Sequence, residues 1–388
     1  DHQDKYSFIR GPCGVTLTGR AKCLGPPDSA KAESTILRDQ FKTFGSSVKW
    51  KQISENCGID FSDRLRCWYS NDFENYSYSS NRPNPVLQAN GYTFKQISAS
   101  GRFVCGILTD DSLVCLGQDN YGRKGDGSNS SINMSTPFVV DSGESYLDIS
   151  VSNKAVCGVT LGNKLKCWGT HDYGNIGTGD SSSHFSPTWI DTSESYLSVE
   201  TNSNYACGLT SAGAIKCWGR SMSEGGSFVE VSQPTTISAG GDAYLQISVT
   251  YNFGCGIRSD NRLLCWGLNS WNRLGTGNST NSAVPVFSGD TGSYKKVFVD
   301  NSSLSCGITS TDTTKCWGGN LAGYSFSTPG IYPSPVFTTM SYGASPFYSR
   351  WLGLGSDGSL AWFYKPDRVP GIPSSTIYYE YVQSLVDK

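Results

Sequence analysis

The cysteines are the reactive side chains with the most regular spacing in this 388-residue chain. All fourteen fall into seven pairs with nine residues between the partners: Cys13/Cys23, Cys57/Cys67, Cys105/Cys115, Cys157/Cys167, Cys207/Cys217, Cys255/Cys265 and Cys306/Cys316. A catalytic thiol or a metal site would need its cysteines once, whereas seven identical pairs indicate a structural unit that is repeated along the chain.

The other residue types that could do chemistry have no recognisable motif around them. His2, His171 and His184 lack partners at a spacing that would suit a metal site or a histidine relay. Carboxylates from separate units could face each other for glycoside chemistry, but the sequence does not place any such pair. The glycine-rich stretches 174–179 and 275–277 lack the Lys-Ser/Thr of a phosphate-binding loop. We therefore expect no catalytic residues, no metal and no cofactor, and we predict that the chain is not an enzyme.

Each cysteine pair brackets the pattern of a β-hairpin, in which two short apolar runs flank a polar centre, as in residues 207–219. Six residues after the first cysteine every unit has Gly, Asn or Asp, the types that tolerate positive φ in a three-residue hairpin loop. A hairpin with this turn brings its two cysteines opposite each other, so the spacing predicts seven disulfides within hairpins.

The residues around the hairpin predict a four-stranded unit. A glycine follows each first cysteine, which indicates a ring in close approach, and we expect that ring to come from the next unit. A tryptophan follows the second cysteine in five units, and we expect it to pack in the core against a neighbouring unit. An alternating strand such as 146–151 precedes the hairpin, and segments at Pro137, Pro285 and Pro335 suit outer edge strands. Four strands per unit is the pattern of a propeller blade.

A cysteine-free unit follows the last pair, because residues 352–363 keep the glycine, the turn and the aromatic residue. The segment 379–386 resembles a first strand, and we expect it to complete the first blade. The sequence thus predicts an all-β fold, a β-propeller of about eight four-stranded blades. Seven blades would have a disulfide, and the C-terminal strand would close the ring by pairing into the first blade. A seven-bladed ring with the C-terminal unit packed elsewhere is the alternative. We expect one domain, 1–388, with units at about 1–45, 46–92, 93–142, 143–192, 193–240, 241–290, 291–338 and 339–388.

The segments that follow the Trp-Gly steps resemble a known repeat. Residues 120–127, 173–179 and 269–277 are similar to the Asn-x-x-Gly-Gln-Leu-Gly-x-Gly tail of regulator of chromosome condensation (RCC1) repeats. With its cysteine pairs, the chain resembles the extracellular repeats of crinkly-type plant receptor kinases. The resemblance implies a propeller, usually of seven blades, and an extracellular setting. The nucleotide-exchange activity of the founding family is not implied, because its partner-binding loops have no match here.

The composition favours a secreted or cell-surface protein. Seven disulfides require an oxidising compartment. Sequons for N-glycosylation occur at Asn75, Asn129, Asn133, Asn278 and Asn301. The start at Asp1 is what a processed mature chain would show, and no apolar run is long enough to span a membrane. A net charge of −2 with interspersed signs does not favour nucleic-acid binding.

The loops after the Trp-Gly steps combine aromatic residues with arginine, which is typical of protein interfaces. The candidate partner-binding residues are Tyr121, Arg123, His171, Tyr173, Trp271 and Arg273. We therefore predict a non-enzymatic interaction or structural module that binds an extracellular protein or assembles with its own copies. A carbohydrate-binding propeller is the alternative, and an enzyme inhibitor or a glycan-active enzyme ranks below both.

Overall fold

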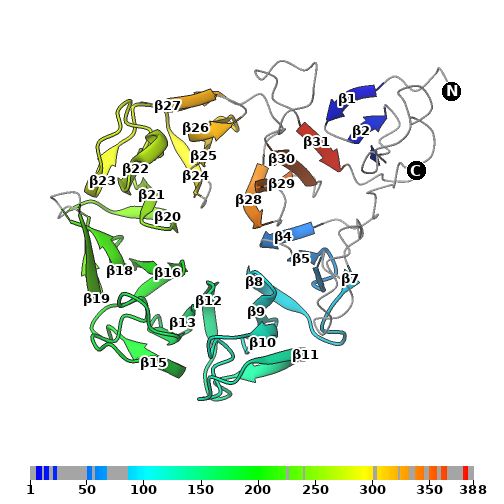
Figure 1. Ribbon diagram of the computed structural model, residues 1–388, viewed down its shortest axis with the longest axis vertical. Coiled ribbons are helices and arrows are strands. Elements are labelled where there is room, and N and C mark those ends of the chain that lie inside the picture. The colour runs from blue at the N-terminus through cyan, green and yellow to red at the C-terminus, as the bar shows by residue number, and fades with distance from the viewer. Residues whose placement is uncertain are drawn as a thin grey trace, which may run out of the picture.

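The computed structural model is a ring of antiparallel β-sheets, shown in Figure 1. It describes residues 6–10, 13–16, 21–23, 50–54, 57–67, 86–223, 227–238, 241–299, 304–321, 324–331, 337–344, 349–355, 360–364 and 379–382. Within these residues the regular structure is almost entirely β-strand, with one short 3-10 helix, η1 (Ser270–Asn272).

Six blades follow one another around the ring, and each has four strands and one cysteine hairpin. They are β4–β7 (Trp50–Ser54, Cys57–Asp60, Leu65–Cys67, Val86–Leu87), β8–β11 (Phe94–Ser100, Phe103–Leu108, Leu113–Asp119, Ile132–Val140), β12–β15 (Tyr146–Val151, Ala155–Thr160, Leu165–Gly169, His184–Ile190), β16–β19 (Tyr196–Thr201, Tyr205–Thr210, Ile215–Met222, Phe228–Thr236), β20–β23 (Tyr244–Thr250, Phe253–Arg258, Leu263–Gly267, Ser282–Phe287) and β24–β27 (Tyr294–Val299, Leu304–Thr309, Thr314–Leu321, Tyr324–Ile331).

The chain ends form two further sheets. A four-stranded sheet without cysteines contains β28 (Phe337–Ala344), β29 (Ser349–Gly355), β30 (Leu360–Tyr364) and β31 (Tyr379–Val382), and it contacts both β24 and β4. A three-stranded sheet contains β1 (Tyr6–Arg10), β2 (Cys13–Thr16) and β3 (Ala21–Cys23), and it contacts β31. Figure 1 shows β28 beside β4 on the inside of the ring and β1 and β2 outside it.

The predicted blade count and ring closure are therefore wrong. The N-terminal hairpin forms the separate three-stranded sheet and does not make an eighth blade, and β31 pairs with β30 of its own sheet and not with the first hairpin. The seven-bladed alternative set aside the C-terminal unit, yet that unit lies in the ring. Leu352 is the register partner of Trp362 in this unit, as the first cysteine is of the second in the other units.

The hairpins have the predicted register. In the six blades the two cysteines are paired across the second and third strands and joined by a disulfide: Cys57–Cys67, Cys105–Cys115, Cys157–Cys167, Cys207–Cys217, Cys255–Cys265 and Cys306–Cys316. Cys13 is likewise the register partner of Cys23, and its side chain lies outside the described residues. The turn residue has positive φ in each blade, for example 72° at Asp111 and 81° at Gly213.

The close approach predicted at the glycine after the first cysteine exists, but its source differs from the prediction. A Cβ atom on Gly158 would lie 2.7 Å from the ring of Tyr146, which belongs to the first strand of the same blade. Gly208 and Tyr196 repeat this arrangement at 2.6 Å. The ring comes from the same blade and not the next one, because the first strand pairs directly with the strand that has the glycine.

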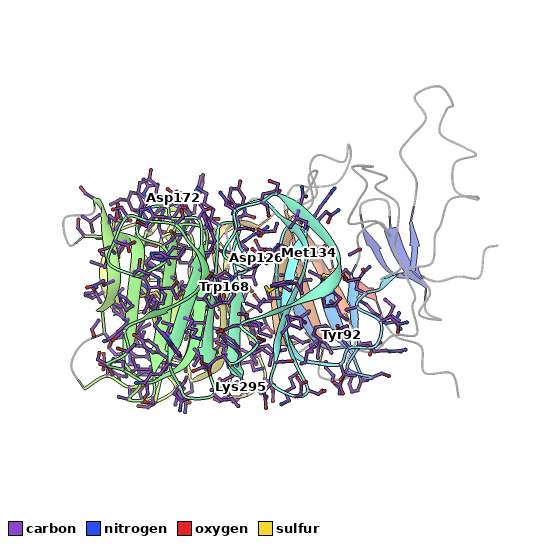
Figure 2. All side chains as sticks on the ribbon, turned by 90° about the horizontal axis from the view of Figure 1, so that it is seen from below. Tyr92, Asp126, Met134, Trp168, Asp172 and Lys295 are labelled. Carbon is purple, nitrogen blue, oxygen red and sulfur yellow. A yellow bond between two sulfur atoms is a disulfide. The ribbon has the colours of Figure 1, made fainter. Side chains whose placement is uncertain are left out.

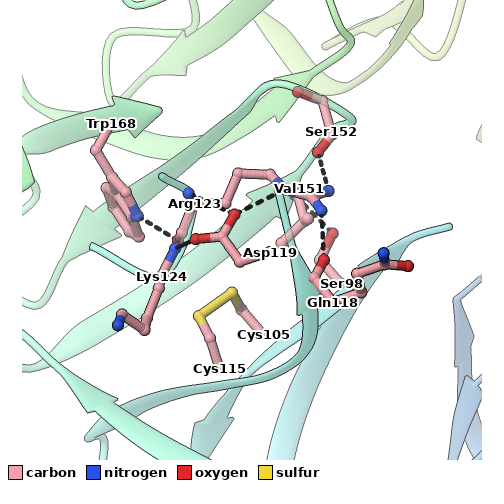
Figure 3. Close-up of a disulfide and its surroundings, with 10 residues drawn as sticks. All are labelled: Ser98, Cys105, Cys115, Gln118, Asp119, Arg123, Lys124, Val151, Ser152 and Trp168. Carbon is pink, nitrogen blue, oxygen red and sulfur yellow. Dashed lines mark hydrogen bonds and ion pairs between the residues drawn. A yellow bond between two sulfur atoms is a disulfide. The ribbon is translucent and has the colours of Figure 1, made fainter. Parts of the chain in front are cut away.

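The tryptophan after the second cysteine joins neighbouring blades. Trp168 is fully buried against the preceding blade, where it packs with the disulfide of Cys105 and Cys115, and its indole Nε1 donates a hydrogen bond to the carbonyl of Arg123 at 2.7 Å. Figure 3 shows this junction. Trp218 repeats it one blade later. The prediction of a core tryptophan at a blade boundary is thus confirmed for Trp168, Trp218, Trp266 and Trp317, whereas Trp68 lies outside the described residues.

The Pro137 and Pro285 segments form outer strands, as predicted. The third proline segment, at Pro335, was interpreted wrongly, since Phe337 begins the innermost strand β28. A proline segment suits both ends of a blade, because the inner and outer strands are both sheet edges.

The innermost strands face the central channel and leave one row of backbone groups without a strand partner. Side chains of the preceding blade occupy this row. The Gln52 amide accepts a hydrogen bond from the N–H of Ile97 and donates one to its carbonyl, both at 2.9 Å. Two residues further along, Ser54 accepts from the N–H of Ala99 at 2.9 Å. Similar bonds follow around the ring, and we call these side chains the channel belt: Gln52, Ser54, Ser98, Asp148, Ser150, Glu200, Gln246 and Ser248.

Candidate partner-binding face

One face of the ring contains the turns between first and second strands and the starts of the loops after the third strands. We call it the loop face, residues 101–102, 119–123, 152–154, 170–175, 202–204, 220–223, 250–252 and 268–273, of which 223 is the last described residue of its loop. Figure 2 shows Asp172 on this face and Lys295 on the opposite face. The opposite face contains the cysteine hairpin turns.

Exposed aromatic side chains gather on the loop face. Tyr121, Tyr173, Tyr251 and Trp271 come from three blades and are all exposed, Trp271 to 61%. Tyr173 and Trp271 also have left-handed backbone conformations, with φ of 53° and 64°. Such conformations cost energy for bulky residues and are concentrated at functional sites. Three of the six predicted partner-binding residues, the two tyrosines 121 and 173 and Trp271, are therefore accessible to a partner.

The two predicted arginines instead hold the scaffold together. The Arg123 guanidinium is buried over the ring of Phe103 at 4.3 Å and donates to the carbonyl of Ser152, at 3.0 Å, in the next blade. Arg273 repeats this position over Phe253 and is also buried. The arrangement leaves little of either side chain for a partner.

His171 is half-buried and fixes its own loop. Its Nε2 accepts a hydrogen bond from the backbone N–H of Gly174 at 3.1 Å, and Glu230 lies 3.7 Å from the same nitrogen. His171 thus shapes the turn that presents Tyr173.

Arg220 connects the aromatic residues, although it was not among the six candidates. Its guanidinium lies 5.1 Å from the ring centre of Tyr173 and 4.4 Å from that of Phe228, and its Nη1 donates to the hydroxyl of Tyr251 at 2.8 Å. We call these four residues the Arg220 cluster. They come from three consecutive blades, and the three aromatic rings are exposed. Phe228 and Tyr251 follow no repeat motif, so only their position in the ring shows that they belong to this site.

The central channel has two carboxyl groups from adjacent blades. Asp148 accepts from the Gln96 amide at 2.5 Å and from the N–H of Val199 at 2.8 Å, and Glu200 accepts from the N–H of Val249 at 2.6 Å. Burial raises the pKa of Asp148. Burial, together with the nearby charge of Asp148, raises the pKa of Glu200 to about 8. Both carboxyl groups thus have structural partners in the neighbouring blades.

Two other features concern the described residues alone. Within them, no group of three or more His, Cys, Asp or Glu side chains could hold a metal ion. The same part of the chain has no helix that is long and apolar enough to cross a membrane.

The predicted glycosylation sites differ in accessibility. Asn129 and Asn278 are exposed in the loops before β11 and β23. Asn133 lies within β11, and its side-chain oxygen is buried without a hydrogen-bond partner. Asn75 and Asn301 lie outside the described residues.

Comparison with known proteins agrees with this fold. Residues 244–270, which contain the Cys255–Cys265 hairpin, match the family described as regulator of chromosome condensation (RCC1) repeat. No curated protein matches the chain in sequence. The chain is thus a β-propeller with one disulfide in each of its six described cysteine blades, and one of its repeats matches the RCC1 repeat family.

Solved structures with the same fold come from several kinds of protein. Prp20p of Saccharomyces cerevisiae has a TM-score of 0.65 at 14% identity, over 87% of this chain and 91% of that one. Human WBSCR16 has a TM-score of 0.62 at 14% identity, over 73% and 79%. The ectodomain of the receptor kinase CR4 from Physcomitrella patens has a TM-score of 0.51 at 18% identity, over 84% and 75%. At these identities the likeness concerns the fold.

Proposed function

We propose that this chain is an extracellular, non-enzymatic interaction module that binds a protein partner through its loop face. The observation that carries the proposal is the set of exposed aromatic rings around Arg220 and at Trp271, on consecutive blades of one face. Aromatic residues and arginine dominate the binding energy of protein interfaces, because large rigid side chains bury much area at little entropic cost.

Two further observations support this reading. The disulfides of the six blades would be stable in an oxidising, extracellular compartment. A protein with the same fold binds other proteins, since Kap60 has been crystallised bound to yeast Prp20 and Prp20p has binding properties to Gsp1p and histones. The partners of those proteins are not carried over to this chain.

The channel carboxyls do not favour an enzyme. A glycoside-cleaving pair needs one carboxyl to protonate the leaving group and another to attack or to activate water. Asp148 and Glu200 instead accept hydrogen bonds from the backbone of the next blade, which makes them part of the scaffold.

The proposal is tested by capture of extracellular proteins on the immobilised chain, with Tyr173→Ala and Trp271→Ala as variants. A central aromatic residue of an interface contributes about 2 kcal/mol or more, so each variant should bind the captured protein about 30-fold more weakly. Trp189→Ala is the matched control, because Trp189 is 45% exposed on the outer strand β15, away from the loop face. Equal capture by the native chain and both loop-face variants would contradict the proposal.

Trp271 also favours a second candidate, carbohydrate binding, because an indole exposed to this extent can stack on a sugar ring. A glycan array decides between the two. Binding to one glycan class that disappears in Trp271→Ala, with no protein captured, would replace the protein partner by a sugar.

A further inference from the structure

The guanidinium of Arg220, at the centre of the Arg220 cluster, contacts aromatic rings and a hydroxyl group. Tyr173 and Phe228 cover the guanidinium within 5.1 Å and 4.4 Å of their ring centres. The only hydrogen bond described for this guanidinium goes to the neutral hydroxyl of Tyr251. Over the described part of the chain, no carboxylate forms an ion pair with Arg220, whereas the loop-face cation Lys154 pairs with Asp172.

The acid on the neighbouring strand forms no ion pair with this guanidinium. Glu230 is the register partner of Arg220 across β18 and β19, but its carboxylate lies beside His171, at 3.7 Å. Among the described residues, the guanidinium of Arg220 is thus surrounded by three exposed aromatic rings and has no carboxylate at ion-pair distance.

The geometry of the guanidinium determines which chemical group of a ligand can bind to its other N–H donors. Aromatic rings lie over the guanidinium, so further hydrogen bonds are directed along its N–H edge. A guanidinium has five N–H donors, and Tyr251 accepts from one of them. A carboxylate fits two adjacent donors of this edge in a bidentate pair, which is stronger than a bond between neutral groups.

We propose that the Arg220 cluster binds an aspartate or glutamate side chain in an acidic segment of a protein partner. This inference rests on the proposed function and specifies the chemistry of the partner. A polypeptide fits better than an acidic sugar, because a sugar pocket needs several converging polar groups. Around Arg220 the described polar contact is one tyrosine hydroxyl, and the exposed rings spread over three blades.

The experiment uses fluorescein-labelled 15-residue peptides and the full chain. One peptide is rich in Asp and Glu, a second has Asn and Gln at the same positions, and a third has Lys. We expect the acidic peptide alone to bind, and its affinity to fall steeply between 50 mM and 300 mM salt because the contact is electrostatic. Arg220→Gln should weaken binding at least tenfold. Arg220→Lys should give an intermediate loss, because it keeps the charge but not the bidentate edge.

Arg262→Gln is the matched control. Arg262 also stacks on an aromatic ring, Phe287, at 3.9 Å, but it lies in a hairpin turn on the opposite face. It should bind the acidic peptide like the native chain.

Several outcomes would overturn the inference. They are equal binding of the acidic peptide by the native chain and Arg220→Gln, equal losses in Arg220→Gln and Arg262→Gln, or no binding of the acidic peptide. Selective binding of an oligogalacturonate in the same assay would replace the acidic protein by an acidic sugar. If Trp271→Ala still reduces protein capture while Arg220→Gln does not, only the acidic partner is refuted. If neither variant affects capture, the loop face itself is refuted as the binding site.

Discussion

Glu200 is an ionisable group in a position that serine occupies in the neighbouring blades, and its replacement by glutamine tests the channel belt. The Glu200 carboxyl accepts a hydrogen bond from the N–H of Val249 at 2.6 Å, as Ser150 does from Thr201 one blade earlier. Glutamine has nearly the same shape and keeps an accepting oxygen. Glu200→Gln therefore removes the charge and preserves the bond between blades.

The expected effect follows from the pKa of Glu200, which is raised from its ordinary 4.5 to about 8. The native state holds the proton up to about pH 8, whereas the unfolded chain releases it near pH 4.5. The native state thus binds more protons between these values, and its stability falls as the pH rises through them. The difference corresponds to about 5 kcal/mol as an upper limit. Glu200 is partly exposed, so solvent screens its charge and we expect about 2 kcal/mol.

The assay is denaturant unfolding with the disulfides intact, at intervals from pH 4.5 to 9. The variant should match the native chain at pH 4.5 and exceed its free energy of unfolding increasingly up to pH 8.5. Glu230→Gln is the control, because it removes a carboxylate with 45% exposure on the loop face and should change stability by less than about 0.5 kcal/mol. Parallel pH curves for the native chain and Glu200→Gln would refute the reasoning.

Four more outcomes are expected. Asp191→Asn should lower stability by about 2 kcal/mol at neutral pH and have little effect at pH 2. Although burial opposes it, the bonds from Lys216 and its neighbours hold the pKa of Asp191 at about 2, so the stabilisation is lost as the pH falls from about 4 to 2. Trp218→Ala should cost about 3–5 kcal/mol, measured by the same unfolding, because it empties a fully buried site between blades. In glycopeptide mapping of secreted material, Asn129 and Asn278 should be modified and Asn133 should not, since the last is held in a strand with a buried side-chain oxygen. Peptide mapping without reduction should return every cysteine linked to the one ten residues away, and a link between units would contradict the hairpin pairing.

The parts of the fold that depend on near neighbours in sequence could be predicted. Cys207 and Cys217 face each other because a turn at Gly213 decides their register, and all of this information lies within one hairpin. The ring closure could not be predicted in this way. β31 resembles an inner strand in composition, yet it pairs with β30, because either edge of a sheet accepts a short alternating strand.

The candidate site also has features that the local sequence predicts and features that depend on the three-dimensional arrangement. The exposure of Tyr173 and Trp271 could be predicted, because aromatic residues in variable loops stand out against the repeat. The burial of Arg123 could not, since a buried arginine over an aromatic ring and an exposed one have the same local sequence. The Arg220 cluster was missed because Phe228 and Tyr251 meet it only when the third strand of one blade, its fourth strand and the next blade's first turn are placed in space.

The junctions between blades have a direction. From Trp168 onward, each blade packs its tryptophan against the disulfide of the blade before it in sequence. A ribosome releases the chain from its N-terminus, so the surface that receives a tryptophan has left the ribosome before the tryptophan does. Each blade can therefore dock on a preceding blade that has already been synthesised. The seam between β28 and β4 differs, because the first of these blades must wait for the last sheet to be synthesised. Truncation from the C-terminus would therefore leave a stack of intact blades with an open seam, whereas a cut near the N-terminus would remove the surface on which the next blade assembles.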